Sequence, residues 1–376
     1  MRRFLLLAAS LGLWASLLPA SAQDLVVKIG HAGPLSGPQA NAGRDNERGV
    51  KLAIADLNAQ DFRIGGRRAR FELVSEDDQG DPRTGTQVAQ KMVDTGVRAV
   101  IGHYNSGVSI PASRIYSQED IPMITGASSN PQLTRQGFAS IFRLAANDNV
   151  MGAAMAEFAA ARGLRKVAVI DDRTAYGTGV ADIFVQTAKG LGLEVVGREF
   201  TNDKATDFTA ILTKFKGLAP EAVFLGGYYA QGAGVARQMR QLDINALLLG
   251  GDGICTAEVV PLGGKLLEGR YFCAQSGRPL DSLPGGPAFR ERFTKTFDAP
   301  IDAYAPAFYV ATLVIARAMQ QAGSDEPKKV TAALKTLKMD SMLGPVQFDA
   351  TGEWLKAPVT AYQIAGGKLV PVERKP

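Results

Sequence analysis

The sequence predicts an α/β protein with two lobes, each built on a mostly parallel β-sheet covered by helices. Short apolar, β-branched runs alternate with glycine-containing loops and amphipathic stretches, the pattern of a parallel sheet covered on both faces. This pattern starts near residue 25 and restarts near residue 166. A chain of 376 residues also exceeds the usual size of a single core. We therefore expect two similar α/β units that face each other across a cleft.

The N-terminal residues 1–22 have the features of a secretory signal peptide. Arg2 and Arg3 precede an apolar run from about Phe4 to Leu18, and Ala20-Ser21-Ala22 provides an A-x-A cleavage site before Gln23. The apolar run is too short for a membrane anchor, and no cysteine near the site could carry a lipid. We expect a cleaved, soluble, exported protein.

In the first half of the chain, strands are expected at 25–30, 71–75, 99–101 and 122–125. Helices are expected at about 44–60, 86–94 and 110–118. The first of these helices is indicated by Val50, Ala53, Ile54 and Leu57, which recur at helical spacing. Strand and helix alternate, so the strands should be parallel.

The second half repeats the pattern, with strands expected at 166–170, 194–197, 222–225 and 247–253. Helices are expected at about 180–189 and 235–241. A looser segment follows residue 275, and then helices at about 305–320 and 327–337. A terminal pair of strands is expected around 346–349 and 360–366.

The charge pattern argues against nucleic acid as a partner. Without Arg2 and Arg3, 40 basic residues stand against 37 acidic ones. The basic residues are scattered and form no stripe interleaved with aromatic residues.

Cys255 and Cys273 are the only cysteines. In an exported protein such a pair most simply forms one disulfide, and two buried free thiols are the alternative. With only two histidines, no C-x-x-C and no H-E-x-x-H, no metal site is expected, and no motif indicates a cofactor.

Five loops with similar composition follow apolar strands, at 30–38, 102–107, 125–130, 171–179 and 226–232. Each combines glycine with small hydroxyl residues or tyrosine, and helices follow. In parallel α/β sheets ligands bind at the carboxyl ends of the strands, where helix N-termini offer free N–H groups. The loops therefore predict a pocket that can accept a carboxylate.

Motifs for catalysis are missing from the sequence. It has no G-x-x-x-x-G-K-[ST], no complete dinucleotide fingerprint and no G-x-S-x-G. His103 and Ser106 could be a base and a nucleophile, but a structural histidine is the favoured interpretation. Asp171 and Asp172 could hold a cation, and a capping role is the more common alternative.

Several segments together resemble the periplasmic leucine/isoleucine/valine-binding proteins of ABC importers. They are GPLSGP, DDQGDP, IGHYNSG, IPMITGASSNPQLT, DDRTAYGTG, FLGGYY and MLGPVQFD, in the same order and spacing as in that family. The resemblance covers essentially the whole mature chain. It implies the type I periplasmic-binding-protein fold, two doubly wound α/β lobes around a ligand cleft with three hinge crossings. By analogy, lobe one is 23–145 plus 276–354 and lobe two is 146–275 plus 355–376.

The resemblance also implies which residues bind the ligand. Ser106 and Ser129 would hold the α-carboxylate of an amino acid, and Ala127, Ser129 and Asp252 would hold its ammonium group. The family usually has Thr at the position of Ser129 and often Glu at that of Asp252. A zwitterion that leaves water needs a fixed partner for each charge, which this set provides.

The same analogy assigns the side-chain pocket to Tyr104, Asn105, Tyr176, Tyr228 and Tyr304. Well-studied members have an apolar residue and a Cys at the positions of Tyr104 and Asn105. They have a Tyr where this chain has Ala42. These departures predict a pocket that is roomier on one side and more polar on another.

The resemblance implies binding without catalysis. A monomer would capture an amino acid, most favourably a branched-chain one, in the periplasm, close its lobes, and dock on the permease of an ABC importer. A ligand sensor of the same fold, a binder of another amino acid or small carboxylate, and an exported hydrolase are the alternatives.

Overall fold

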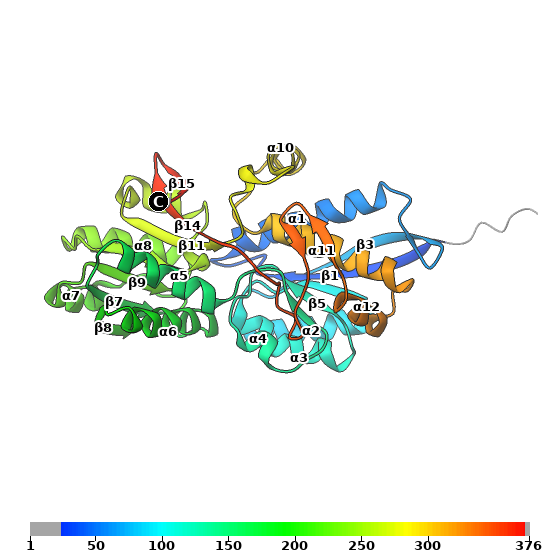
Figure 1. Cartoon of the computed structure of the whole chain (residues 1–376), viewed down its shortest axis with the longest axis horizontal. Helices are drawn as coiled ribbons and strands as arrows, with labels where there is room; N and C mark the ends of the chain where they lie inside the picture. Colours follow the sequence, from blue (N-terminus) through cyan, green and yellow to red (C-terminus); the bar gives the residue numbers. More distant parts are fainter. Residues whose placement is uncertain (1–23, 373–376) are drawn as a thin grey trace, which may run out of the picture.

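The computed structural model describes residues 24–372, which form two β-sheets that lie end to end with helices on both faces (Figure 1). The predicted α/β class is confirmed. The predicted signal peptide lies outside the described residues. Between residues 24 and 372, no helix has the length and apolar character needed to cross a membrane.

The first sheet has the strand order β2-β3-β1-β4-β5-β6. All neighbours pair in parallel except β2 and β3. Its strands are β1 (Leu25–Gly33), β2 (Arg63–Ile64), β3 (Arg67–Asp77), β4 (Ala99–Gly102), β5 (Met123–Thr125) and β6 (Ile141–Arg143). Strands β4, β5 and β6 are buried along their whole length, as expected for parallel strands covered on both faces.

The helices of this half are α1 (Ala40–Asn58), α2 (Pro82–Thr95), α3 (Ser106–Gln118), α4 (Gln132–Arg135), α11 (Ala305–Ala322) and α12 (Pro327–Leu334). Helix α11 packs on α1 although more than two hundred residues separate them. Helices α2 and α3 start about four residues earlier than predicted. Their first turns hold polar and small residues that give no apolar periodicity, and α2 is capped by the Asp81 carboxylate, which accepts from the Thr84 N–H at 2.8 Å.

The second sheet has the order β15-β14-β11-β10-β9-β7-β8. Its strands are β7 (Lys166–Asp171), β8 (Glu194–Phe200), β9 (Ala222–Gly226), β10 (Leu247–Gly250), β11 (Tyr271–Ser276), β14 (Val359–Ala365) and β15 (Lys368–Pro371). The helices around it are α5 (Asp148–Ala161), α6 (Ala175–Gly190), α7 (Thr209–Leu218), α8 (Tyr229–Gln241) and the short α9 (Val259–Gly263), with 3-10 turns η1 (Asp252–Ile254) and η2 (Gly264–Leu267). The helical turn η3 (Leu280–Ser282) and helix α10 (Gly286–Phe297) follow β11.

The last two predicted strands are partly confirmed. Segment 360–366 falls on β14, whereas only Val346 of segment 346–349 lies in a strand. That strand, β13 (Gly344–Val346), forms a hairpin with β12 (Met339–Ser341), and β14 pairs antiparallel with β11 and β15. Gly366 and Gly367 both have positive φ, of 59° and 69°, which permits the tight turn that returns the chain onto β14.

The chain passes between the two halves three times, after β6, after β11 and before β14. Hydrogen bonds tie these crossings to one another. The Trp354 N–H donates to the Arg143 carbonyl at 3.1 Å, and the Ala146 N–H donates to the Ser276 hydroxyl at 2.7 Å. The Thr360 hydroxyl donates to the Gly277 carbonyl at 2.8 Å. The lobe boundaries at 145, 275 and 354 stay a prediction.

The disulfide is confirmed. Cys255 and Cys273 are bonded, with a Cα–Cα distance of 5.4 Å. The bond joins the segment after η1 to the middle of β11, next to the loop that carries Asp252. It therefore fixes the loop that carries Asp252 to the sheet.

Candidate functional site

The carboxyl ends of the strands in the two sheets face each other, and the loops that follow them meet. One small cavity lies at this meeting point. Nine side chains or backbone segments line it: Tyr104, Ser106, Ala127, Ser129, Tyr176, Tyr228, Asp252, Gly253 and Tyr304. The space between them is about 10 Å³, room for about one water molecule.

The structure thus brings together eight of the nine residues that the sequence assigns to the ligand. The ninth, Asn105, lies directly beside them, because its side-chain amide donates to the Tyr228 hydroxyl at 3.0 Å. Sequence reasoning missed Gly253. Its Cα lies so close to the Gly227 carbonyl that a Cβ would stand 2.5 Å from that oxygen. The three glycines around Asp252 are the sequence feature that could have indicated a close backbone approach here.

Ser106 lies at the start of α3, directly after the N-cap residue Asn105. The N–H groups in the first turn of a helix have no carbonyl acceptor within the helix. The helix dipole also favours negative charge at this end. The Ser106 hydroxyl accepts from the Asn130 N–H at 3.1 Å, which fixes its position. This corner of the cavity is suited to an anion.

The loop 126–131 forms a second wall of the cavity. Hydrogen bonds with Thr125 and Arg143 fix its backbone. The Thr125 hydroxyl accepts from the N–H groups of Ala127 and Ser128. The Arg143 guanidinium donates to the carbonyls of Ser128 and Asn130, at 2.5 and 3.1 Å. The Ser129 hydroxyl is buried and lines the cavity.

Asp252 provides negative charge on the opposite wall. Its side chain is buried, and Oδ1 has no hydrogen-bond partner in the described part of the chain. Burial raises the pKa of the Asp252 carboxyl to about 6. The Tyr304 hydroxyl donates to the Asp252 carbonyl at 3.0 Å and fixes the backbone of this loop.

A second buried carboxyl, that of Asp148, lies behind Ser129 and was not predicted. The Asp148 N–H donates to the Ser129 carbonyl at 2.9 Å. Burial raises the pKa of Asp148 to about 8, and the neighbouring charge of Asp252 contributes to this shift. The sequence around it, AANDNV, reads as an ordinary helix start, and no motif distinguishes it.

Four tyrosines form the remaining wall. Tyr104 packs edge-on against Tyr304 at 5.3 Å between ring centroids, and Tyr176 packs against Tyr228 at 5.3 Å. Tyr104 and Tyr304 follow elements of the first half, and the other two follow strands of the second half. The Tyr176 hydroxyl accepts from the Gly253 N–H at 2.8 Å, whereas the buried Tyr104 hydroxyl has no partner among the described residues.

His103 and Ser106 do not form a catalytic pair. The His103 ring bonds to the Asp78 carboxylate at 2.7 Å and to the Tyr116 hydroxyl at 3.0 Å, so both ring nitrogens are occupied. His103 is a buried structural residue, as the favoured interpretation expected.

Asp171 and Asp172 bond to neighbouring protein groups. Asp171 pairs with Arg198 at 2.7 Å, and Asp172 accepts from the Thr174 N–H at 3.0 Å. Within residues 24–372, no group of three or more histidine, cysteine or carboxylate side chains is placed to hold a metal ion.

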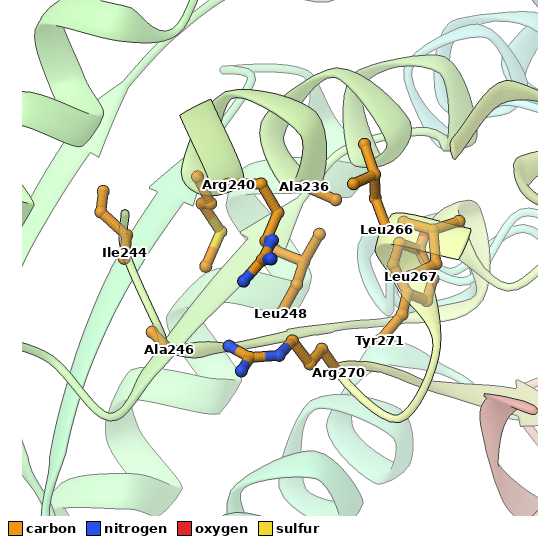
Figure 2. Close-up of a pocket in the computed structure, with 10 residues that line it drawn as sticks. Ala236, Arg240, Ile244, Ala246, Leu248, Leu266, Leu267, Arg270 and Tyr271 are labelled. Atoms are coloured by element: carbon orange, nitrogen blue, oxygen red, sulfur yellow. The ribbon is translucent and has the colours of Figure 1, made fainter. Parts of the chain in front are cut away.

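A second depression lies at the other end of the second sheet (Figure 2). Leu248 and Leu267 are among the apolar side chains that line it, and Arg240 and Arg270 also line it. It is near the amino ends of β10 and β11, far along the strands from the loops described above. The candidate ligand site is therefore the cavity between the two sheets.

Comparisons with known proteins show which family the chain resembles. Residues 26–368 match the family model described as periplasmic binding protein. The chain is 32% identical to the leucine-, isoleucine-, valine-, threonine-, and alanine-binding protein of Pseudomonas aeruginosa, over 90% of this chain and 89% of that one. It is 30% identical to a Leu/Ile/Val-binding protein of Rhizobium johnstonii, over 96% and 97% of the two chains.

A crystal structure of a leucine binding protein from Thermotoga maritima is similar, with a TM-score of 0.85 and 27% identity over 92% of this chain and 98% of that chain. Proteins of this family bind substrates for transport and are not enzymes. The fold is that of the type I periplasmic binding proteins. This chain belongs to the periplasmic binding protein family.

Proposed function

We propose that this protein captures an amino acid, most favourably leucine, isoleucine or valine, and delivers it to the permease of an ABC importer. One observation carries the proposal. The cavity places the start of a helix and two serines opposite a buried aspartate, so it offers a partner for each charge of a zwitterion. The names of the relatives from Pseudomonas aeruginosa and Rhizobium johnstonii support the branched-chain set.

In this proposal the ligand carboxylate binds the hydroxyl and N–H of Ser106 and the hydroxyl of Ser129. The ammonium group binds the Ala127 carbonyl, the Ser129 hydroxyl and the Asp252 carboxylate. The cavity has room for about one water molecule, so the two halves must part further to admit an amino acid. The residues that would then surround the ligand side chain are Tyr104, Asn105, Tyr176, Tyr228 and Tyr304. Charge-assisted hydrogen bonds of this kind offset the loss of hydration when a zwitterion is buried.

Closure of the two halves is the second part of the proposal. Asn105 reaches Tyr228 across the cleft, and the Asn130 amide donates to the Ala175 carbonyl at 2.5 Å. Such contacts form only when the halves are together, so the loaded, closed form presents a surface that the open form lacks. The protein would work as a monomer in the periplasm, to which the predicted signal peptide would direct it.

The test is a calorimetric titration of mature protein that has been unfolded, stripped of bound ligand and refolded. Leucine, isoleucine and valine are titrated first and the other amino acids afterwards. Binding at micromolar or lower Kd for the aliphatic set supports the proposal. Failure of every amino acid to bind a correctly folded protein contradicts it. Loss of uptake after gene deletion separates transport from a sensing role.

One observation favours a second ligand, an amino acid with a hydroxyl group. The Tyr104 hydroxyl is buried at the cavity without a partner, and a threonine hydroxyl could bond to it. The name of the Pseudomonas aeruginosa relative includes threonine. A lower Kd for threonine than for valine in the same titration would favour this candidate.

A further inference from the structure

The structure contains a much larger cavity than the one between the ligand loops. Its volume is about 710 Å³, within the range of small-molecule sites. Its lining residues come from the α10 segment, the β14–β15 hairpin and the start of α11. Figure 1 shows where these elements lie. Of the residues that line the ligand cavity, only Tyr304 also lines this one. We call it the hinge-side cavity.

The walls of the hinge-side cavity include all three chain crossings. Leu144 belongs to the first crossing, Gln275 to Gly277 belong to the second, and Trp354 belongs to the third. These crossings are bonded to one another, for example by the hydrogen bond from the Ala146 N–H to Ser276. Any rotation of the two halves about the crossings must therefore change the shape of this cavity.

Apolar side chains from both halves face the cavity. Val260 and Leu369 come from the second half, and Leu280, Leu283 and Ile301 come from the segment around α10 and the start of α11. Water forms no hydrogen bonds with such walls. An apolar group that replaces the water lowers the free energy by about 25 cal/mol for each Å² of apolar surface buried. The lining thus suits an occupant with a substantial apolar part.

The charged lining has an excess of positive groups. Arg278, Arg290 and Lys368 line the cavity, against the carboxyls of Asp281 and Asp302. Asp281 already pairs with Arg290 at 2.9 Å. Burial raises the pKa of Asp302 to about 8, and the nearby Asp45 and Glu258 add to this shift, so this carboxyl is mostly uncharged at neutral pH. Arg278 and Lys368 are left to attract an anion.

We propose that the hinge-side cavity binds a small organic anion with an apolar body, such as a medium-chain carboxylate, and that its occupancy changes the balance between open and closed forms. The apolar tail lies among Val260, Leu280 and Leu283, and the anionic head lies near Arg278. Lys368 lines the cavity at the other end of β14 and adds to its positive potential. A ligand shifts a conformational equilibrium when it binds the two forms with different affinity. The three crossings form part of the cavity walls, so the cavity should have a different shape, and a different affinity for the anion, in the open and closed forms.

The test uses the mature protein and decanoate as the probe. Calorimetry measures decanoate binding, and displacement of the fluorescent anion 8-anilinonaphthalene-1-sulfonate gives a second readout. Small-angle X-ray scattering measures the radius of gyration with and without decanoate. These measurements require no amino acid in the cleft, so their outcome does not depend on the proposed transport function.

Two variants identify the site. Val260→Trp fills the cavity and is expected to abolish saturable binding. The double variant Arg278→Glu, Lys368→Glu reverses two exposed charges, should fold normally, and is expected to raise the decanoate Kd at least about tenfold, the equivalent of about 1.4 kcal/mol. The matched control Arg114→Glu, Lys335→Glu makes the same charge change at exposed positions outside the cavity and should leave the Kd unchanged.

We expect saturable binding of one decanoate per protein and a shift in the radius of gyration. Absence of saturable binding overturns the site, as does equal weakening by the double variant and its control. Binding with no change in the radius of gyration overturns the coupling to closure. Unfolding curves in urea show that each variant is folded before its affinity is compared.

Discussion

The buried Arg143 and the part-buried Glu353 form an ion pair that joins two segments 210 residues apart in the chain. The guanidinium donates to both carboxylate oxygens, at 2.7 and 3.0 Å. It also donates to the carbonyls of Ser128 and Asn130, which flank Ser129. One side chain thus ties the first and third crossings together and positions a loop of the ligand cavity.

Replacement of Arg143 by Ala should destabilise the protein strongly. The change removes the ionic partner of Glu353, which keeps hydrogen bonds from Thr134 and Asn147, and leaves two carbonyls without their donor. Removal of one member of a buried pair costs about 3–5 kcal/mol, and the partial exposure of Glu353 favours the lower end of this range. The free energy of unfolding, measured with urea, should fall by this amount. The control Arg135→Ala removes an exposed guanidinium from the end of α4 and should change it by less than about 0.5 kcal/mol. Similar losses in both variants would contradict the assigned role.

The sequence predicted the two-sheet α/β architecture because strand and helix periodicities alternate clearly in both halves. It predicted the loops that follow β1, β4, β5, β7 and β9, because each comes after an apolar strand. It did not identify Asp148, since a polar residue at a helix start has many local explanations. It also gave no partner for β14, because that partner is set by a two-glycine turn and by contact with β11.

The hinge-side cavity could not be predicted either. Its lining comes from segments spread between residues 126 and 369, and only the three crossings bring these segments together. Side-chain periodicity reports which face of one element is buried. It carries no information on a space enclosed by several loops.

The first prediction for the ligand cavity concerns Ser106. Replacement of Ser106 by Ala should weaken amino-acid binding by about 1–3 kcal/mol, because a hydrogen bond to a charged carboxylate is lost. Calorimetry with leucine measures this change. Ser117→Ala, near the other end of α3, is the matched control and should leave the Kd unchanged. An unaltered Kd for the Ser106 variant would contradict the prediction that Ser106 binds the ligand carboxylate.

The disulfide between Cys255 and Cys273 should contribute to stability. The two residues are 18 positions apart, and closing a loop of about this length restricts the unfolded chain by about 3 kcal/mol. The double variant Cys255→Ser, Cys273→Ser should therefore lower the free energy of unfolding by about 2–4 kcal/mol. A reducing agent should lower the stability of the natural protein by a similar amount and leave the variant unaffected. A variant as stable as the natural protein would contradict this prediction.

Tyr104 should limit the size of the ligand. Its ring fills space at the cavity, and its buried hydroxyl lacks a partner. Tyr104→Leu should therefore lower the Kd for leucine relative to that for alanine, because it frees volume for a larger side chain. Tyr104→Phe removes only the hydroxyl and separates the two effects. If neither variant changes the ratio of the two Kd values, the ring does not border the ligand side chain.

Asp252 should make amino-acid binding depend on pH. An ammonium group binds the ionised carboxylate, and the pKa of Asp252 is raised to about 6 by burial. At pH 5 the carboxyl must first lose its proton, which weakens binding about tenfold relative to pH above 7, since one pH unit corresponds to about 1.4 kcal/mol. The Kd for leucine should therefore fall between pH 5 and pH 7.

Asp252→Asn should bind leucine more weakly at pH 7 and lose the fall in Kd around pH 6, because the amide has no proton to release. Asp340→Asn changes an exposed carboxyl elsewhere and is the matched control, which should keep the pH profile of the natural protein. Calorimetry in buffers of different ionisation enthalpy adds a direct count of released protons. A natural protein that releases no proton on binding leucine at pH 5 would show that the ammonium group does not meet Asp252.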